Sequence, residues 1–548
     1  MKPALFDRVH SPSHIPLENG SRVGIVGGGP AGSFFAYFLL QFAGRMGLSI
    51  SVDIYEPKDF SAMGPAGCNM CAGVVSESLI QALSIEGIEL PGDVVQRGIN
   101  AFVLHTDSDL LTMAAPFNEM RIAAVYRGGG PPKARGISPT SFDRVLLQLA
   151  GSRGANVIRE RVTDLNWSEG KPRIRTGGRT QTYDLVAGAF GVNSTAGKFF
   201  EDLDFGYRQP RKRKTYNCEV ERGSDIGRGS AGGSMHAFLL NLPEMDFAAV
   251  VPKRSYFTLC LLGRDINPNF VHSFLQHPAV KPVFSAEGPM FSEGCRCAPW
   301  ASLGEAKHPY GDRVVLIGDC GMSRLNKDGI GSAYRTAKAA AATAVFSGIS
   351  GNDFRKGFGP ICRSIRRDNR FGSLLFFIMG FVRKIGLLNR SVMRMARAEQ
   401  QKTGARREMT RVLWDMLTGS APYRDIFLRT LHPAFVGRFF WNLLGGMEVR
   451  SGNVRDSQYS SESREEKRAL GRSYCEGDVI VRKGEKGDCM YVIQSGRAEV
   501  LIPGENGKEI QLGVLSKGDF FGERAIIEDE LRSATVKALT EVRVIVVD

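Results

Sequence analysis

The stretch RVGIVGGGPAG, from Arg22 to Gly32, decides how the amino-terminal part of the chain is expected to fold. It begins as a short apolar strand and continues into a glycine-rich turn, which opens an apolar helical pattern over Ser33–Met46. A second strand is expected over Ile50–Tyr55 and ends at Glu56. The order of strand, glycine turn, helix and strand predicts a βαβ unit, and therefore a parallel sheet.

The glycines of this turn have the spacing G-x-G-x-x-G, at Gly27, Gly29 and Gly32. The first allows a tight turn, the second lets the backbone approach a pyrophosphate, and the third lets the helix pack on the strand. The unpaired N–H groups of the helix N-terminus then face the phosphates. Glu56 is placed to accept hydrogen bonds from a ribose diol, and an extension near Phe42–Gly47 explains its greater distance along the chain. These residues predict a dinucleotide site, with a purely structural turn as the alternative.

The composition excludes several classes of protein. The chain has 548 residues, of which 43% are hydrophobic and 23% charged, as in ordinary globular domains. Its 10 cysteines are too few for a disulfide scaffold, so we expect a cytoplasmic location, and no apolar core of a secretory signal occurs before Gly20. The longest apolar run, Gly372–Val382, is far shorter than the roughly 20 residues that a membrane-spanning helix needs.

The patterns along the chain predict an α/β protein built from five segments. A Rossmann-like nucleotide-binding domain is expected over residues 18–199 and 301–350, with an inserted antiparallel β substrate domain over 200–300. A basic helical segment over 351–447 and a polar linker over 448–470 follow. Short strands separated by Gly-Asp and Gly-Glu turns predict a compact all-β roll over 471–548.

A second motif, Val314-Val-Leu-Ile-Gly-Asp319, comes late in the chain. Together with the glycine turn it resembles the FAD-dependent oxidoreductases of the p-hydroxybenzoate hydroxylase fold, and within that group the geranylgeranyl reductase family, over roughly Val23 to Thr343. The resemblance implies that Asp319 binds the ribityl chain of FAD, with an N-cap as its alternative role. It also implies that the next helix begins at the flavin pyrimidine edge, where its dipole stabilises reduced flavin. The cofactor residues implied in this way are Gly318, Asp319, Gly329, Ile330 and Gly331.

Two departures from the family concern the electron donor. The family's Gly-Ala-Asp-Gly element is replaced by Gly188-Ala-Phe-Gly191, which has Phe190 in place of the acid. The arginine that usually precedes the Phe-Asp pair is missing before Phe142 and Asp143. Direct use of NAD(P)H and delivery of electrons by a redox protein therefore both stay open.

Cysteines occur in two close pairs, Cys68 with Cys71 and Cys295 with Cys297. The run Cys71-Ala-Gly-Val resembles the Cys-Gly-Gly-Gly element that lies near the flavin in geranylgeranyl reductases, which implies a catalytic, substrate-side role for Cys71, with Cys68 as its C-x-x-C partner. Simple packing, a redox disulfide and a zinc or iron–sulfur site are the alternatives. Because C-x-C is not a usual metal spacing, we predict no metal.

The excess of positive charge is concentrated in one segment. Between Asp353 and Arg411 there are 15 Lys and Arg residues and 4 Asp and Glu residues. Aromatic and aliphatic residues are interleaved with them, as in Phe371–Val382 and Phe435–Leu444. This mixture favours an anionic membrane surface over nucleic acid, and therefore a peripheral position at the inner face of a membrane. A helical cap packed on the flavin domain is the alternative.

The carboxy-terminal motifs resemble a cyclic nucleotide-binding domain. They include Gly518-Asp-Phe-Phe-Gly-Glu523 and a phosphate-binding cassette that runs from Phe521 to Val536. The resemblance implies that Glu523 accepts a hydrogen bond from the ribose 2′-hydroxyl, that Arg532 pairs with the cyclic phosphate, and that a hydroxyl after it favours cGMP over cAMP. The implied site residues are Gly522, Glu523, Ala525, Arg532 and Ser533.

The family's helices that cover the base are missing after Val547, so we expect the preceding domains to supply this cover or the chain to have been cut. A degenerate, purely structural roll is the alternative. Taken together, the chain is expected to be an FAD-dependent oxidoreductase that reduces an apolar, isoprenoid-like substrate, with cAMP or cGMP as regulator. An FAD monooxygenase and a non-metabolic, cyclic nucleotide-dependent redox sensor are the alternative functions.

Overall fold

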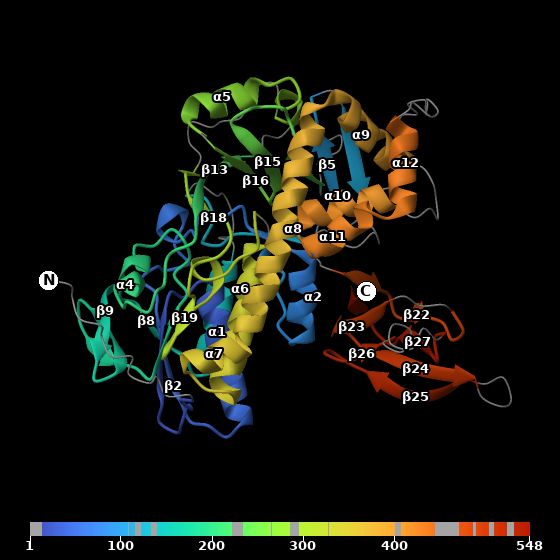
Figure 1. Ribbon diagram of the computed structural model, residues 1–548. Helices are drawn as coiled ribbons and strands as arrows, with labels where there is room; N and C mark the ends of the chain where they lie inside the picture. The colour runs from blue at the N-terminus through green and yellow to red at the C-terminus, as the bar shows by residue number, and fades with distance from the viewer. Residues whose placement is uncertain are drawn as a thin grey trace.

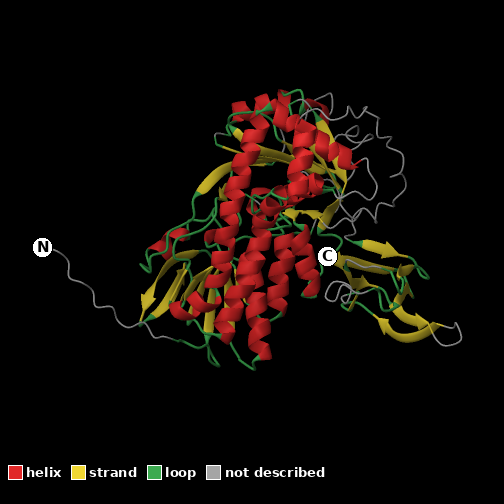
Figure 2. Cartoon of the chain, turned by 45° about the vertical axis from the view of Figure 1, so that its right-hand side comes forward, coloured by secondary structure: helices red, strands yellow, loops and turns green. Residues whose placement is uncertain are grey.

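The molecule consists of an amino-terminal body, residues 14–443, and a carboxy-terminal β-roll, residues 471–547 (Figure 1). Figure 2 shows the helices stacked in the middle of the body, with the strands of the β-roll to one side. The computed structural model describes residues 14–107, 109–114, 122–132, 140–221, 234–264, 266–284, 295–326, 328–400, 407–443, 471–485, 489–503, 509–522 and 531–547.

A six-stranded sheet forms the base of the body. Its order is β19-β20-β12-β1-β2-β8, and all neighbouring strands are parallel except the edge pair β19 and β20. The predicted βαβ unit and the Rossmann-like fold are therefore confirmed. The strands are β1 (Arg22–Val26), β2 (Ser51–Tyr55), β8 (Asn156–Ile158), β12 (Leu185–Gly188), β19 (Tyr310–Gly311) and β20 (Val314–Leu316).

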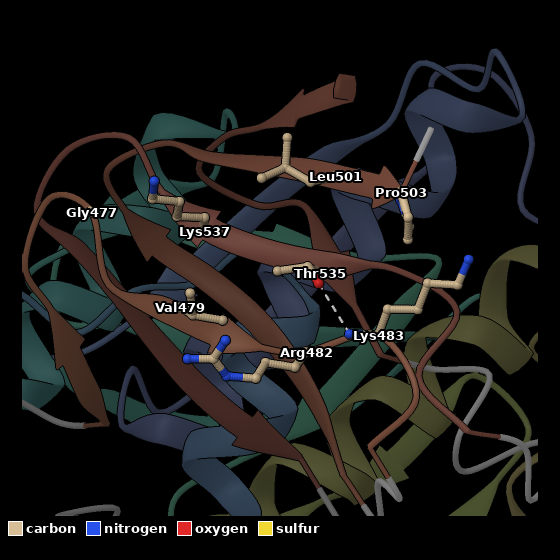
Figure 3. A pocket seen from close by; sticks show the side chains of 8 residues that line it. All are labelled: Gly477, Val479, Arg482, Lys483, Leu501, Pro503, Thr535 and Lys537. Atoms are coloured by element: carbon tan, nitrogen blue, oxygen red, sulfur yellow. Dashed lines mark hydrogen bonds between the residues drawn. The ribbon is translucent and has the colours of Figure 1, made fainter. Parts of the chain in front are cut away.

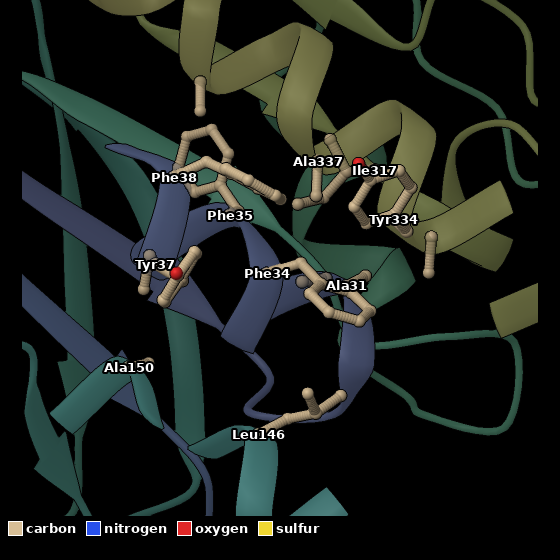
Figure 4. Close-up of a cluster of buried hydrophobic side chains, with 14 of the residues drawn as sticks. Ala31, Phe34, Phe35, Tyr37, Phe38, Leu146, Ala150, Ile317, Tyr334 and Ala337 are labelled. Carbon is tan, nitrogen blue, oxygen red and sulfur yellow. The ribbon is translucent and has the colours of Figure 1, made fainter. Parts of the chain in front are cut away.

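Helices cover one face of this sheet, namely α1 (Pro30–Arg45), α3 (Phe142–Ser152) and α6 (Gly329–Phe346). Helices α1 and α6 contact each other through aromatic rings: the ring centroids of Phe34 and Phe38 in α1 lie 5.5 and 5.6 Å from that of Tyr334 in α6 (Figure 4). A three-stranded sheet, β9 (Val162–Ser168), β10 (Lys171–Thr176) and β11 (Thr180–Thr182), packs on the other face. Both faces are thus buried, as a parallel sheet requires.

A larger, eight-stranded sheet lies beside the base. It runs in the order β17-β13-β16-β15-β14-β5-β6, with β18 paired to β13. Strands β5 and β6 come from the part of the chain that the sequence placed in the nucleotide-binding domain, and β5 pairs with β14 in parallel, so this sheet is neither a pure insertion nor fully antiparallel. Its strands are β5 (Ala101–His105), β6 (Leu110–Ala114), β13 (Lys212–Glu221), β14 (Ser234–Phe238), β15 (Met245–Pro252), β16 (Tyr256–Gly263), β17 (Arg296–Cys297) and β18 (Trp300–Ser302).

Helix α5 (Pro268–Gln276) packs on one face of the eight-stranded sheet. The basic helical segment covers part of the other face, where the Trp414 ring meets that of Phe102 edge-on at 5.0 Å. No single described helix is long and apolar enough to span a membrane, and the pair α8 and α9, which together have the length and composition, is bent by 106°. The segment comprises α7 (Gly351–Gly357), α8 (Gly359–Lys384), α9 (Gly386–Gln400), α10 (Glu408–Thr418), α11 (Tyr423–Thr430) and α12 (Pro433–Leu443).

A small sheet and one helix connect the base to the β-roll. Strands β3 (Val74–Val75), β4 (Val95–Ile99) and β7 (Ile122–Val125) form the sheet, and α2 (Glu77–Ile85) follows β3 directly. Helix α2 packs against the roll strands β23 and β28 (Figure 1).

The carboxy-terminal segment is all-β, as the sequence predicted, and it contains two four-stranded sheets. One has the order β21-β28-β23-β26 and the other β22-β27-β24-β25. Apolar residues on both sheets face each other in a single core. The strands are β21 (Arg472–Tyr474), β22 (Val479–Val481), β23 (Met490–Ser495), β24 (Ala498–Pro503), β25 (Glu509–Leu515), β26 (Phe520–Phe521), β27 (Thr535–Ala538) and β28 (Val542–Val547).

Candidate functional site

The glycine turn between β1 and α1 leaves room for a ligand at one position only. Gly27 has φ +108°, and a Cβ atom there would lie 2.6 Å from the carbonyl oxygen of Ala189; a Cβ on Gly32 would lie 1.9 Å from that of Gly27. At Gly29, the N-cap of α1, the nearest atom to such a Cβ is the Nδ2 of Asn69, at 3.6 Å. Two glycines are therefore needed for packing, whereas a Cβ atom at Gly29 would make only ordinary contacts with side chains and none with backbone, as backbone that approaches a pyrophosphate requires.

Glu56 is held rigidly at the end of β2. Its Oε2 accepts a hydrogen bond from the N–H of Gly28 at 2.8 Å, and its Oε1 accepts one from the N–H of Lys58 at 2.9 Å. Burial raises the pKa of this carboxyl group, and the two N–H donors oppose the shift. Each carboxylate oxygen keeps an acceptor site, so Glu56 is suited to bind a ribose diol beside the turn.

A buried ion pair stands next to Gly29. Arg127, after β7, donates hydrogen bonds of 2.8 and 2.9 Å to the two carboxylate oxygens of Asp143, which is fully buried. The side chain of Asn69 also donates to Asp143. The sequence interpretation missed Arg127, because it expected the arginine just before Phe142. The one sequence signal was the Phe142-Asp143 motif itself: because the expected arginine does not precede it, Asp143 needs a partner from elsewhere in the chain.

The turn after β20 meets the glycine turn. Gly318 has φ +64°, and a Cβ atom there would lie 2.8 Å from the Cβ of Ala31 in the first turn of α1. Asp319, which follows, is half-buried, and its Oδ1 would lie 3.5 Å from a Cβ atom at Gly329. The fold therefore brings together the N-termini of α1 and α6 and the Gly-Asp turn, as the resemblance implied.

The N-terminus of α6 differs from the prediction in one respect. Asp328 is its N-cap, and the Oδ1 of this side chain accepts the N–H of Gly331 at 3.2 Å and the hydroxyl of Ser76 at 2.9 Å. Arg335 donates to its Oδ2 at 2.8 Å. The N–H of Gly331 thus bonds to this carboxylate and not to a ligand, which leaves Gly329 and Ile330 as the backbone that can face one. An Asp directly before Gly-Ile-Gly is a usual capping signal, so the sequence held this information.

The two cysteine pairs lie together. Across the eight-stranded sheet, Asn217 of β13 is paired with Cys297 of β17 on one side and with Cys260 of β16 on the other. The side-chain amide of Asn217 donates to the carbonyl of Met70 at 3.1 Å, which holds the loop of Cys68 and Cys71 over this row. All these thiols are free, and among the described residues no group of His, Cys, Asp or Glu has a geometry that could hold a metal ion.

Three thiols of this cluster, those of Cys68, Cys295 and Cys297, are held in the protonated form by burial. Burial raises the pKa of Cys68 and of Cys295, and it raises that of Cys297 to about 12. The thiol of Cys71 lies within hydrogen-bonding reach of the Arg127 guanidinium. Because the thiolate is the nucleophile, buried protonated thiols are suited to donate protons rather than to attack.

A second buried ion pair lies beside the cysteines. Lys253 is 1% exposed, and its Nζ lies 3.0 Å from Oε1 of Glu219 on β13 and 4.1 Å from the centre of the Tyr126 ring. Thr258 donates to Glu219 at 2.9 Å. The charges neutralise each other between the small and the eight-stranded sheets. No signal in the sequence indicated this pair, since its members are separated along the chain and lie in unremarkable strand patterns.

In the β-roll, Arg532 has the environment of an anion-binding residue. It is 7% exposed, and its guanidinium donates to the carbonyl of Gly522 at 2.9 Å and contacts the Sγ of Cys489 at 3.6 Å. No acidic side chain within the described ranges forms an ion pair with it. Gly522 has φ +85°, and a Cβ there would lie 2.3 Å from the guanidinium. Ser533 is exposed, and Glu523 and Ala525 lie outside the described residues.

A separate cavity of about 490 Å³ opens on the outer side of the same roll (Figure 3). The N–H of Lys483 donates to the hydroxyl of Thr535 at its wall, at 3.1 Å. Three cationic side chains face it, and of the predicted nucleotide residues that the structure describes, Gly522, Arg532 and Ser533, none lines it. The lining residues are Gly477, Val479, Arg482, Lys483, Leu501, Pro503, Thr535 and Lys537.

Comparison with known proteins matches residues 471–548 to the family model of the cyclic nucleotide-binding domain. The cAMP-dependent protein kinase regulatory subunit of Blastocladiella emersonii is 44% identical over 66 residues, which are 12% of this chain and 16% of that protein. The cGMP-dependent protein kinase of Eimeria tenella is 48% identical over 67 residues, 12% of this chain and 6% of that protein. The chain therefore spans only a small part of these relatives, namely the domain itself.

The body is similar to solved flavoproteins. A flavoprotein/dehydrogenase from Cytophaga hutchinsonii is 15% identical with a TM-score of 0.53, and the match covers 78% of this chain and 100% of that one. A geranylgeranyl bacteriochlorophyll reductase-like protein from Thermoplasma acidophilum has a TM-score of 0.44 at 14% identity, over 78% of this chain and 100% of that one. The first likeness shows the fold. Residues 471–548 are thus a cyclic nucleotide-binding domain, joined to a body with the fold of a flavoprotein/dehydrogenase.

Proposed function

We propose that the protein is an FAD-dependent oxidoreductase that reduces an apolar, isoprenoid-like substrate under the control of a cyclic nucleotide. The surroundings of Gly29 carry this proposal, because a Cβ atom there would contact only side chains, at 3.6 Å or more, whereas Gly27 and Gly32 are closely packed against backbone. Glu56 and Asp319 follow β2 and β20, which lie on opposite sides of β1 in the six-stranded sheet. The residues therefore fit a dinucleotide that lies across the N-termini of α1 and α6.

In this arrangement Gly29 would bind the pyrophosphate, Glu56 the adenosine ribose and Asp319 the ribityl chain. Bound FAD would supply two-electron reduction. The chain's own part is to orient the substrate, exclude water and hold protons. The protonated thiols of Cys68 and Cys297 hold protons at Sγ, and the adjacent Lys253–Glu219 pair adds no net charge to the site.

An apolar substrate fits the surroundings of the C-x-x-C loop. Ala72 and Val74, which follow Cys71, and Leu325, which precedes α6, are partly buried against the apolar cluster of the eight-stranded sheet and the helical segment. On that sheet Ala249 and Val251 are buried in the same cluster. The hydrocarbon part of a substrate that reached Cys71 would therefore contact apolar side chains, which favours this part over a charged group near Cys71.

The proposed reaction predicts that reduced enzyme is reoxidised by an isoprenoid and that Cys71 matters for this step. In stopped-flow under anaerobic conditions, geranylgeranyl diphosphate should restore the oxidised flavin spectrum, whereas 4-hydroxybenzoate should not. Cys71→Ser should slow this reoxidation by about tenfold or more, because a serine hydroxyl is a much weaker acid. FAD content should be unchanged.

Cys475→Ser is the matched control, since Cys475 is an exposed thiol of the β-roll. A hydroxylated product formed with O₂ would indicate a monooxygenase instead. Reoxidation by neither compound, with a flavin potential that depends on cyclic nucleotide, would indicate a sensor. A Cys71→Ser enzyme with the rate of wild type would remove Cys71 from the reaction.

Regulation by cyclic nucleotide is supported by the contact between the β-roll and α2. The side-chain amide of Gln81 donates to the carbonyl of Val546 at 3.4 Å, and Lys517 forms an ion pair of 3.1 Å with Glu89. Ile545 of the roll is fully buried in the same cluster as Leu79 of α2. At the other end of this helix its N-cap Ser76 donates to Asp328, at the start of α6. One short helix thus touches both the roll and the proposed flavin site.

This contact predicts that nucleotide changes the rate of flavin reduction and that weakening the contact reduces the change. Nucleotide binding can change the state of the body only if the nucleotide binds with different affinities to two arrangements of the contact between the β-roll and α2. Glu89→Lys places like charges at the interface, and since an exposed pair contributes at most about 1 kcal/mol, the nucleotide effect should fall by about two- to fivefold. The size of the nucleotide effect is measured as the rate of flavin reduction in stopped-flow with and without cAMP or cGMP.

Glu89→Lys combined with Lys517→Glu restores opposite charges and should restore the effect. Calorimetry on the same variants should show a nucleotide affinity that differs from that of wild type by no more than this two- to fivefold coupling. If the single variant responds to nucleotide as wild type does, the signal does not pass through α2.

A further inference from the structure

The exposed face of α8 carries an apolar stripe. Leu374, Phe377, Ile378 and Phe381 are spaced at i, i+3, i+4 and i+7, so they share one face of the helix. Their exposed fractions are 41, 73, 39 and 56%. The opposite face of α8 packs into the body, where the ring of Phe376 meets that of Tyr423 at 5.7 Å. Scattered exposed apolar residues are common on proteins, but a periodic stripe on one helix is not.

The same face is basic one to three turns earlier. Arg363, Arg367 and Arg370 precede Leu374 at helical spacing and are exposed. Within the described part of the chain none of the three forms an ion pair. Lys384 follows the stripe at the end of α8 and is exposed as well. The solvent-facing side of this helix therefore changes along its axis from cationic to apolar and ends in a cation.

The elements that follow α8 also carry exposed apolar residues. Ile385 and Leu387, at the sharp bend between α8 and α9, are 36 and 49% exposed. Helix α12 packs on α9, where the hydroxyl of Ser391 donates to the carbonyl of Phe439 at 3.2 Å. The next two residues of α12, Phe440 and Trp441, are 54 and 63% exposed.

We propose that this surface docks on an anionic membrane, with the apolar stripe of α8 inserted at the interface and the arginines paired with lipid headgroups. Charge complementarity selects this occupant. A second copy of the chain would bring the same cationic face against itself, whereas anionic lipid neutralises Arg363, Arg367 and Arg370. The stripe from Leu374 to Phe381 runs for about 10 Å along the helix axis. A helix that lies in the plane of the interface buries such a face in the headgroup region.

The experiment is co-sedimentation of the full-length protein with vesicles of phosphatidylcholine containing phosphatidylserine, and with vesicles of phosphatidylcholine alone. Wild type should bind the anionic vesicles at low salt, and binding should weaken as salt rises, because headgroup attraction is screened. The double variant Phe377→Ser/Phe381→Ser should lower the partition coefficient by about tenfold or more, because two aromatic side chains lose their insertion. Arg367→Glu/Arg370→Glu should abolish the preference for phosphatidylserine.

The matched control is Ile510→Ser/Leu512→Ser, which removes two exposed apolar residues from β25 of the roll, 51 and 61% exposed. It should bind as wild type does. All four substituted apolar or aromatic residues are exposed, so the variants should fold.

Failure of wild type to bind at low salt would overturn the proposal, as would full binding by Phe377→Ser/Phe381→Ser. A wild-type dimer that this variant converts to a monomer in light scattering would show a protein interface instead. None of these readouts depends on flavin turnover, so the test is independent of the proposed enzyme activity.

Discussion

Replacement of Gly29 by valine is expected to give a folded protein that has lost its FAD. Gly29 is the N-cap of α1, and a Cβ atom there would lie 3.6 Å from its nearest neighbour, so the substituted chain can keep its fold. The valine methyl groups would, however, fill the space through which a pyrophosphate must approach the backbone. Because the phosphates could then no longer reach the N–H groups of the turn, affinity should fall by roughly 100-fold or more.

The ratio of flavin absorbance to protein absorbance in the purified variant measures this loss, and thermal unfolding followed by circular dichroism checks the fold. Gly44→Val is the matched control. Gly44 lies near the exposed end of the same helix, and a Cβ atom there would meet nothing within 4 Å. This control should keep stoichiometric FAD. A yellow Gly29→Val protein with full occupancy would mean that the nucleotide lies elsewhere.

Arg532→Ala is expected to abolish binding of cyclic nucleotide. The guanidinium is buried, and inside the described ranges no carboxylate pairs with it, so it is suited to bind a cyclic phosphate. Two charge-assisted hydrogen bonds are lost in the variant, which corresponds to about 3 kcal/mol or roughly 100-fold in affinity. Arg532→Lys should bind with intermediate affinity, because an ammonium group cannot form the two parallel bonds of a guanidinium.

Isothermal titration of the full-length protein with cAMP and with cGMP measures both variants and also decides which nucleotide binds more tightly. Arg482→Ala is the matched control, since Arg482 faces the separate cavity on the outer side of the roll. It should leave the affinity unchanged. If Arg482→Ala lost binding and Arg532→Ala kept it, the nucleotide would occupy that outer cavity, and the assignment from the cassette would be wrong.

The local elements of this protein were predictable from sequence because their determinants are local. A strand, a G-x-G-x-x-G turn and a helix in direct succession leave little choice of fold, and the structure has β1, the turn and α1 at those positions. The β-roll follows from the same logic, since glycine turns lie beside its strands β21 to β26 in the sequence. In both regions the residues that specify the structure are neighbours along the chain.

Pairing between distant strands could not be read in this way. Ala101–His105 is buried at every position, and such a strand carries no alternation to show which sheet it joins. It pairs with β14, more than a hundred residues later, so the eight-stranded sheet includes chain that the sequence placed elsewhere. Arg127 was missed for a similar reason, because its partner Asp143 is reached through space from the end of β7.

The sequence by itself determined the glycine turn, the Gly-Asp turn and the cyclic nucleotide-binding domain, since short-range backbone geometry and turn chemistry specify each of them. Tertiary structure alone decided that Cys68 and Cys71 lie over the row of Cys260, Asn217 and Cys297, and that the roll rests on α2. Spacing along a chain does not encode which distant residues meet. That outcome depends on how the apolar faces of whole sheets and helices are buried together, which is a property of the folded chain as a unit.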